Sequence, residues 1–486
     1  MIEFRDVTFF YGEETAPSVD GVSLKIDKGE TVVLCGESGC GKSTMTRLIN
    51  GLIPHFHEGK LGGEVLYDGK RTTDMRLYEL SEHVGSVFQD PRTQFYNVES
   101  TVELAFGCEN LGVPPEEIER RITRTATRFG LEELLDRNLF AMSGGEKQRI
   151  ACGSVDATNP ETLVLDEPSS NLDLFAIHDL AQVVQRWRDD GKTLVIAEHR
   201  IFYLVDLADR FIYIRDGRIE REFRPDELRT LSPEALEDLG LRAPDPWKLA
   251  PRAEARGSGK SLSLRSLKCI TRGRRRLSIP ELTLPRGEII AVIGRNGAGK
   301  TTLARTLCGL EKTGSGVLGI DGATHDIRKR RDLVYMVMQD VNHQLFTEDV
   351  ISELLLSMDG TDPDAEQKRA MEILRSLDLD DKSGRHPMSL SGGEQQRVAI
   401  GSAIAAGREI LILDEPTSGL DHKRMTQVAD YLTAMSADGK TVLVITHDIE
   451  LVLRCCSHAI YLVDGEVAQK SRMDETGAQQ LREFFE

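Results

Sequence analysis

The pattern of apolar and polar positions alternates between short continuous apolar runs and longer stretches of helical periodicity. Six of the runs are β-rich, at residues 31–35, 163–165, 193–197, 289–293, 411–413 and 441–446. Continuous apolar strands that are separated by helical patterns are typical of a parallel sheet covered on both faces. The sequence therefore predicts an α/β fold, with functional groups at the carboxyl ends of the strands.

Two glycine-rich loops follow the runs at 31–35 and 289–293, and each fits the pattern G-x-x-x-x-G-K-[ST]. The first loop consists of Gly36, Glu37, Ser38, Gly39, Cys40, Gly41, Lys42, Ser43 and Thr44, and the second of Gly294, Arg295, Asn296, Gly297, Ala298, Gly299, Lys300, Thr301 and Thr302. A strand, such a loop and then a helix form the context of a phosphate-binding site, in which backbone N–H groups and the lysine contact the phosphates. One match could be a simple chain reversal, whereas two matches in this context predict two nucleotide sites.

Further motifs repeat at a nearly constant spacing. After Lys42 come Gln89, Ser143-Gly144-Gly145-Glu146, Asp166-Glu167 and His199; after Lys300 come Gln339, Ser391-Gly392-Gly393-Glu394, Asp414-Glu415 and His447. The halves are offset by 258 residues at the lysines, by 250 at the glutamines and by 248 at every later motif. This spacing indicates a duplicated domain. The eight extra residues of the first half are expected within 53–63, as a loop insertion in preference to a metal site.

Composition and charge narrow the class of protein. The 486 residues are too many for one core, and 40% hydrophobic with 29% charged residues describes an ordinary globular protein. A net charge of −18 disfavours general nucleic-acid binding. The eight cysteines form no C-x-x-C pair, which favours reduced thiols over disulfides or zinc. We expect no membrane span, because no apolar run reaches the roughly 18 residues that a span needs. We also expect no signal peptide, because residues 1–6 lack a basic region followed by an apolar core.

The complete series of motifs resembles the nucleotide-binding domains of the ATP-binding-cassette (ABC) superfamily along nearly the whole chain. The discriminating element is the signature motif at residues 142–149 and 390–397, which lies just before a strand that ends in Leu-Asp-Glu-Pro. The resemblance implies two tandem P-loop domains, each a RecA-like, mostly parallel sheet with helices and a helical signature subdomain. We expect the first domain at 1–245, a linker at 246–260 and the second domain at 261–486.

The resemblance also implies ATP and Mg²⁺ as cofactors and a role for each repeated residue. Residues implied to hold Mg²⁺ are Ser43, Gln89 and Asp166 in the first half, and Thr301, Gln339 and Asp414 in the second. Glu167 and Glu415 would orient or deprotonate the attacking water. Gln89 and Gln339 would reach the metal and the water, while His199 and His447 would contact the γ-phosphate.

In this superfamily the signature of one domain closes over the ATP that the other domain binds. The implied sites are therefore composite and head-to-tail, with two ATP molecules per chain. Ser143, Gly144 and Gly145 would complete the site of Lys300, and Ser391, Gly392 and Gly393 that of Lys42. Such a pair would close around ATP and open after hydrolysis.

Two features depart from a standard, symmetric pair. The glutamine that usually follows Ser-Gly-Gly is a glutamate in both halves, Glu146 and Glu394. Tyr11 lies 25 residues before Gly36, where the superfamily stacks an aromatic ring on adenine. No Phe, Tyr or Trp occurs between residues 247 and 335, so the second half lacks this ring. We therefore expect two hydrolytic sites with weaker adenine recognition at the second.

Residues 87–95, 101–107 and 109–114 are similar to the ATPases of energy-coupling-factor importers, which take up vitamins and transition metals, and residues 337–346 are their counterpart. This similarity implies an integral membrane T component and a substrate-binding component as partners. It also implies a peripheral position at the cytoplasmic face of the cell membrane. The ATPase of a sugar importer and a soluble ribosome-associated cassette factor are the alternatives.

The connector and the C-terminal tail bear on these alternatives. The connector 221–260 holds eight basic and eight acidic residues, and we interpret it as one short helix and an extended tether. Because it has no RNA-seeking charge, no nucleic-acid partner is expected. Residues 468–486 are expected to form a helical tail.

Overall fold

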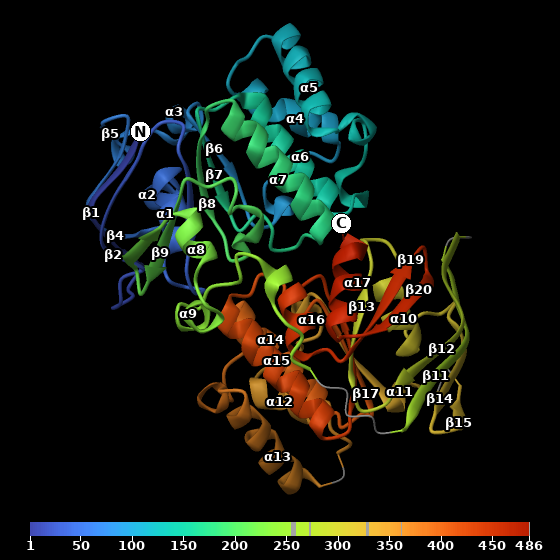
Figure 1. The fold of residues 1–486 in the computed structure, drawn as a ribbon. Helices are drawn as coiled ribbons and strands as arrows, with labels where there is room; N and C mark the ends of the chain where they lie inside the picture. Colours follow the sequence, from blue (N-terminus) through green and yellow to red (C-terminus); the bar gives the residue numbers. More distant parts are fainter. Residues whose placement is uncertain (254–258, 272–273, 327–329, 361, 486) are drawn as a thin grey trace. The chain divides into compact units, whose positions relative to one another are not determined.

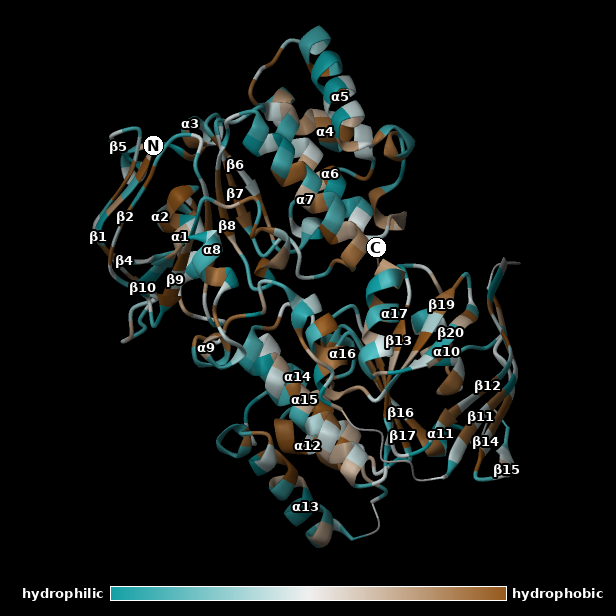
Figure 2. Cartoon of the chain, viewed as in Figure 1, coloured by the Kyte–Doolittle hydropathy of each residue, from teal (hydrophilic) through white to brown (hydrophobic). Residues whose placement is uncertain are grey.

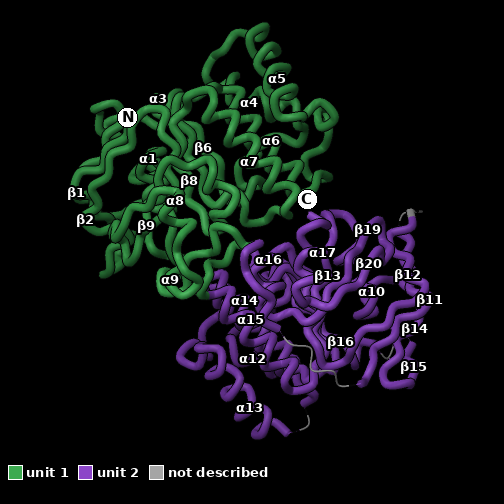
Figure 3. The backbone as a smooth tube through the Cα atoms, viewed as in Figure 1, with its two compact units in different colours: residues 1–246, 419–423 green, residues 247–418, 424–486 purple. Residues whose placement is uncertain are grey.

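The structure, a computed structural model, describes residues 1–253, 259–271, 274–326, 330–360 and 362–485. Its backbone forms two compact units, one of residues 1–246 and 419–423 and the other of residues 247–418 and 424–486 (Figure 3). Residues 254–258 of the predicted linker lie outside the described part of the chain. The domain limits 1–245 and 261–486 stay a prediction.

The first unit contains a six-stranded, mostly parallel sheet and a four-stranded antiparallel sheet (Figure 1). The six-stranded sheet has the order β10 (Arg218–Phe223), β9 (Arg210–Arg215), β3 (Thr31–Cys35), β8 (Thr193–Ala197), β7 (Thr162–Asp166) and β6 (Val84–Val87). The second sheet has the order β2 (Val19–Ile26), β1 (Ile2–Tyr11), β4 (Gly59–Tyr67) and β5 (Lys70–Arg71). Only β10 is antiparallel to its neighbour in the larger sheet, which confirms the predicted parallel core.

The second unit repeats this topology. Its six-stranded sheet runs β16 (Val334–Val337), β17 (Ile410–Asp414), β18 (Thr441–Ile445), β13 (Ile289–Ile293), β19 (His458–Val463) and β20 (Glu466–Arg472). Its four-stranded sheet runs β12 (Arg274–Pro285), β11 (Ser261–Thr271), β14 (Ser315–Ile320) and β15 (Ala323–His325). The same strand order in both units is what a duplicated domain predicts.

A group of three helices carries the signature motif in each unit. These helices are α4 (Ser100–Asn110), α5 (Pro115–Phe129) and α6 (Gly144–Thr158), and α12 (Val350–Leu356), α13 (Pro363–Ser376) and α14 (Gly392–Ala405). In each group all three helices contact one another. Figure 2 shows that α5 is largely hydrophilic, whereas the strands of the larger sheet are hydrophobic.

The remaining helices are short or cover the sheets. In the first unit they are α1 (Lys42–Ile49), α2 (Leu52–His55), α3 (Leu77–Ser81), α7 (Leu174–Asp189), α8 (Pro225–Arg229) and α9 (Pro233–Asp238). In the second they are α10 (Lys300–Leu307), α11 (Arg330–Leu333), α15 (His422–Ala437), α16 (Ile449–Cys455) and α17 (Glu475–Phe485). Among the described residues, no helix combines the length and apolarity that crossing a membrane requires.

Strand β3 shows why the apolar runs are continuous. Val33 and Cys35 belong to the core cluster on one face of the sheet, and Val32 and Leu34 to the cluster on the other. All four side chains are fully buried. Because successive strand residues point to opposite faces, a strand that is covered on both faces needs apolar residues at every position.

The structure corrects the expected location of the eight extra residues. In the first unit Phe4 on β1 pairs with Val65 on β4, and in the second unit Leu264 on β11 pairs with Leu318 on β14. Val65 and Leu318 therefore occupy equivalent positions in the two sheets. Val65 follows Lys42 by 23 residues, whereas Leu318 follows Lys300 by 18. Only five of the extra residues therefore precede this pair, as helix α2 and the first part of β4. The other three lie between β4 and β6.

Two smaller expectations were also wrong. The connector contains two short helices, α8 and α9, because Pro225 and Pro233 each begin one at a position that tolerates proline. Residues 466–472 form the edge strand β20, and only the residues from Glu475 onward form a tail helix.

We predict that Gly401→Val destabilises the second unit. A Cβ atom at Gly401 on α14 would lie 2.9 Å from Leu377 Cδ1 in the core. Overpacking of this kind costs about 1–3 kcal/mol, which exceeds the roughly 0.5 kcal/mol that valine gains over glycine in a helix. The thermal unfolding midpoint should fall by several degrees. Gly384→Val is the control, because a Cβ atom there meets nothing within 4 Å. Equal midpoints for the two variants would contradict the prediction.

Candidate functional site

The two glycine-rich loops turn sharply between a buried strand and a helix. Gly36, Gly39 and Gly41 have φ values of 144°, 83° and 109°, and Gly297 and Gly299 have values of 84° and 101°. A Cβ atom at Gly36 would lie 2.2 Å from the carbonyl oxygen of Ile214, and sterics therefore require glycine there. The loops end at the first residues of α1 and α10, whose N-terminal N–H groups favour an anion.

The lysine of each loop points back across the turn. Lys42 Nζ donates to the carbonyl oxygens of Gly36 (3.0 Å) and Glu37 (2.9 Å). Lys300 Nζ donates to the carbonyl oxygens of Gly294 (2.6 Å) and Arg295 (3.2 Å). Each ammonium group is therefore fixed inside its loop, where it can neutralise phosphate charge.

A hydroxyl and an aspartate meet beside each lysine. Ser43 Oγ donates to Asp166 Oδ1 at 2.8 Å, and Thr301 Oγ1 donates to Asp414 Oδ2 at 2.9 Å. Burial raises the pKa of both aspartates, an effect that the hydroxyl hydrogen bonds partly offset. Burial thus disfavours the charged carboxylates, and a cation placed at these oxygens would relieve the cost.

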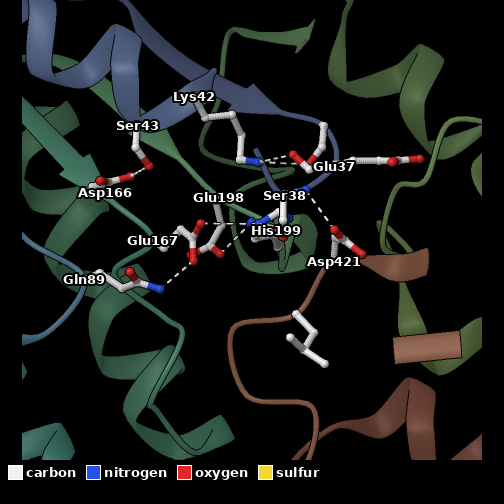
Figure 4. A network of polar contacts seen from close by, with 12 residues as sticks. Glu37, Ser38, Lys42, Ser43, Gln89, Asp166, Glu167, Glu198, His199 and Asp421 are labelled. Atoms are coloured by element: carbon white, nitrogen blue, oxygen red, sulfur yellow. Dashed lines mark hydrogen bonds and ion pairs between the residues drawn. The ribbon is translucent and has the colours of Figure 1, made fainter. Parts of the chain in front are cut away.

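The carboxylate after each aspartate lies in a polar network (Figure 4). Gln89 Nε2 donates to Glu167 Oε2 at 2.8 Å, and His199 Nε2 lies 3.3 Å from Glu167 Oε1. Burial acts to raise the pKa of Glu167, but the hydrogen bond from His199 and its charge lower it overall. Glu167 and Glu415 have φ values of 44° and 50°. Both glutamates thus share the same left-handed backbone conformation.

The two histidines have different partners. His199 Nε2 lies 3.4 Å from Ser38 Oγ and close to the Glu167 carboxylate, which favours a proton on Nε2. His447 Nε2 lies 2.9 Å from Lys300 Nζ and 3.3 Å from Glu415 Oε1. The same ring nitrogen thus faces an ammonium group in the second site and a hydroxyl group in the first, while in both sites it approaches the glutamate.

The first unit includes part of a loop that follows Glu415. Asp421 Oδ2 accepts a hydrogen bond from the Ser38 backbone N–H at 2.8 Å (Figure 4). Lys423 Nζ lies 3.7 Å from Glu37 Oε2. Both contacts are made to the first glycine-rich loop.

Each signature motif forms the first turn of a helix, with its serine and its first glycine exposed. Ser143 and Ser391 are the N-cap residues of α6 and α14, and Gly144, Gly145, Gly392 and Gly393 begin these helices. Glu146 Oε2 accepts from the Ser143 N–H at 2.7 Å, and Glu394 Oε2 accepts from the Ser391 N–H at 2.8 Å. The glutamates thus complete capping boxes, in which the side chain of the third helical residue accepts the N-cap N–H. How each signature relates to the other half's loop stays a prediction.

Tyr11 ends strand β1 beside the first loop. Arg47 donates to the Tyr11 hydroxyl at 2.9 Å, and Thr44 Oγ1 lies 3.3 Å from it. The ring of His57 meets Tyr11 edge to face at 6.1 Å between centroids. Sequence reasoning missed Arg47 and treated His57 only as part of an insertion. Neither residue belongs to a repeated motif, and their proximity to Tyr11 arises from the fold.

The loops, lysines, hydroxyls and acidic pairs together define a P-loop nucleotide-binding protein. The chain matches the ABC transporter family over residues 19–170 and 277–418. A Treponema denticola protein with the provisional name of ABC transporter ATP-binding protein is 41% identical over 478 residues, which cover 97% of each chain. A second Treponema denticola protein of that provisional name is 37% identical over 495 residues, which cover 100% of this chain and 99% of its own.

The chain belongs to the ABC transporter family, with two nucleotide-binding domains, and its domains are those of an ATPase. Similarity of fold extends to a solved structure, a model of ribosome-bound archaeal Pelota and ABCE1. It has a TM-score of 0.70 and 22% identity, and the match covers 99% of this chain and 80% of that chain. The predicted tandem arrangement of cassettes is thereby confirmed.

The donor set fits Mg²⁺ and ATP, which members of the family bind. Each site offers a hydroxyl and a carboxylate oxygen, and Mg²⁺ prefers oxygen ligands while it keeps several waters and contacts substrate phosphates. The described residues contain no cluster of three or more His, Cys, Asp or Glu side chains that could hold a metal ion by itself.

We predict that Glu394 stabilises the second unit in a pH-dependent manner. Burial acts to raise its pKa, but hydrogen bonds from Lys382 and Ser391 lower it from 4.5 to about 2. Because the folded-state pKa is depressed, this stabilisation is fully present above about pH 4.5 and is lost as the pH falls toward 2. The difference in unfolding midpoint between wild type and Glu394→Ala should therefore shrink below pH 4.5. Glu372→Ala, at an exposed position of α13, is the control, and a difference that grows with acid would contradict the prediction.

Proposed function

We propose that the chain is the energy-coupling subunit of an importer, which hydrolyses ATP at two Mg²⁺-dependent sites and transmits the change to a membrane partner. The proposal rests on the family, the two sites and one duplicated surface feature. Energy-coupling-factor importers for a vitamin or a metal ion are the class that the sequence resembles.

The site geometry supports distinct roles for the residues of each half. Mg²⁺, when bound, would neutralise phosphate charge, and Ser43 with Asp166, or Thr301 with Asp414, would hold it. Glu167 is oriented by Gln89 and His199, so that its carboxylate is held in place to accept a proton from water. Its lowered pKa keeps the carboxylate ionised at neutral pH. Glu415 is the corresponding base of the second site.

The observation that carries the transport proposal is an exposed apolar residue after each site glutamine. Tyr96 is 79% exposed, and its counterpart Phe346 is 75% exposed. A second apolar residue accompanies each of them. In the first cassette Tyr96 stacks on Phe106, with 4.9 Å between the ring centroids. In the second cassette the position equivalent to Phe106 is Leu356, which is exposed. Exposed apolar groups at equivalent places in both cassettes favour a pair of protein contacts.

The fold holds both of these residues rigidly. Glu103 is 3% exposed and accepts from the backbone N–H groups of Tyr96 (3.1 Å) and Asn97 (2.8 Å). Glu353 is also 3% exposed, and it accepts from the backbone N–H groups of Phe346 and Thr347. A buried carboxylate in each half thus holds the backbone that carries an exposed aromatic ring, seven residues after Gln89 in the first half and after Gln339 in the second. This arrangement could transmit motion between a docked partner and ATP.

The partners and location follow from this proposal. The partner is an integral membrane T component, with a separate substrate-binding component, and the chain lies at the cytoplasmic face of the membrane. Each chain would bind two ATP molecules, and each signature would complete the other half's site. The ATPase of a sugar importer and a ribosome-associated factor are competing outcomes of the experiments below.

We predict that Glu167→Gln and Glu415→Gln each reduce ATP turnover. Removal of a general base lowers the rate at its own site by about 10²–10⁴-fold, so each single variant should lose that site's share and the double variant nearly all turnover. ATP affinity should persist, because the loops and lysines are intact. Phosphate release and equilibrium ATP binding are the measurements. Glu133→Gln, at an exposed position, is the control, and full turnover in Glu167→Gln would contradict the assignment.

We predict that Tyr96→Asp and Phe346→Asp weaken capture of the membrane partner. A carboxylate at either position would place charge in an apolar contact, while the ATP sites remain intact. The tagged chain is captured from detergent-solubilised membranes, and integral membrane proteins are quantified. Tyr78→Asp is the control, because Tyr78 is a 57% exposed aromatic residue outside both patches. Recovery of ribosomes in place of membrane proteins would overturn the transport proposal.

A further inference from the structure

The residues that flank the site histidine differ between the two cassettes. The first cassette reads Glu198-His199-Arg200, and the second reads Thr446-His447-Asp448. Charged residues therefore occupy both flanks of His199, whereas the only charged flank of His447 is the residue after it. Neither Glu198 nor Arg200 has a role in the site described above.

Glu198 is buried, and its carboxylate accepts several hydrogen bonds. It is 1% exposed, and Oε1 accepts from the backbone N–H groups of His199 (2.7 Å) and Arg200 (3.1 Å). Its other oxygen accepts from the Ser169 N–H at 3.3 Å and from the Tyr203 hydroxyl at 2.9 Å. Four donors compensate a buried charge that would otherwise be costly.

Arg200 makes a second contact with the same loop. Its Nη1 donates to the carbonyl oxygen of Leu172 at 3.4 Å, and the side chain is buried. Ser169 and Leu172 belong to the loop that joins Glu167 to α7. The charged flanks of His199 thus contact both ends of the loop 169–172.

These contacts close a ring around the first site. The chain runs from Glu167 to Ser169, Ser169 donates to Glu198, Glu198 precedes His199, and His199 contacts Glu167. Figure 4 shows Glu167, Glu198 and His199 of this ring. Displacement of the loop would therefore shift the Glu198 carboxylate, which accepts the backbone N–H of His199. His199 would then move relative to Glu167.

The second cassette makes its connection on the other side of the histidine. Asp448 Oδ2 accepts from Thr417 Oγ1 at 2.8 Å, and Thr417 is the counterpart of Ser169. Asp448 also caps α16 through its other oxygen, which accepts the Leu451 N–H. Arg200 provides no such cap, and only a three-residue turn at Ile201–Tyr203 follows it. In the first cassette Glu198 and Arg200 therefore form what we call the brace, a pair of side chains that contact the loop 169–172 and cap no helix.

We propose that Glu198 and Arg200 are positioning residues of the first ATP site, which fix His199 to the loop 169–172 and so align His199 with Glu167. The proposal rests on the assignment of His199 and Glu167 to that site. It goes beyond that assignment because it identifies the contacts that position His199 in the first site. The second site makes the corresponding contact with different residues.

The test uses the full chain with Glu415→Gln, so that turnover reports the first site. Glu198→Gln should lower kcat about tenfold with little change in KM for ATP, because a neutral amide weakens charge-assisted hydrogen bonds but leaves the phosphate loop intact. Hydrogen exchange followed by mass spectrometry should show about tenfold faster exchange in the loop 169–172, with α7 unchanged. Arg200→Lys should show the same changes at smaller size, and Thr446→Val should change neither measurement.

Dependence on His199 separates positioning from general stability. In a His199→Ala background, Glu198→Gln should cause no further loss of kcat, because its effect passes through the imidazole. An equal further loss in that background, or unchanged exchange and kcat in both brace variants, would overturn the proposal. If His199→Ala alone leaves turnover intact while Glu198→Gln still loosens the loop, the assignment of His199 fails and the brace remains as a structural contact only.

Discussion

The whole structure depends on one steric constraint, the reversal of the chain between β3 and α1 and its copy between β13 and α10. In both copies the chain takes a positive φ at the glycine before the lysine, 109° at Gly41 and 101° at Gly299, which glycine adopts readily. A Cβ atom at Gly41 would lie 2.4 Å from the Ser18 carbonyl oxygen, so the residue just before β2 also restricts this turn. Because the parallel strands end at this edge, the acids of β7 and the histidine after β8 reach the loop without further machinery.

Duplication preserved this geometry and left the charges around it free to diverge. His447 Nε2 lies 2.9 Å from Lys300 Nζ, whereas His199 Nε2 lies 3.4 Å from Ser38 Oγ, and each histidine also approaches the glutamate of its own site. The surroundings of the two histidines thus differ, although both sites retain their acids.

The sequence predicted most of the frame because its determinants are local. Five-residue apolar runs gave β3, β8 and β13 their limits, and fixed spacing identified the acids and histidines. It could not predict the contact of Glu198 with Ser169 or that of Arg47 with Tyr11, because the two partners lie more than 25 residues apart along the chain. The tail was misjudged for a similar reason, since β20 exists by pairing with β19 and carries no strong apolar pattern of its own.

Three carboxylates beside the site motifs share one physical arrangement. Glu146 and Glu394 stand at a position where a carboxylate accepts a backbone N–H and faces a helix N-terminus, so the negative charge is stabilising. Glu198 likewise places a negative charge where backbone N–H groups converge. In each case the carboxylate is compensated by backbone donors next to a site motif, which lowers the cost of holding a negative charge close to the site.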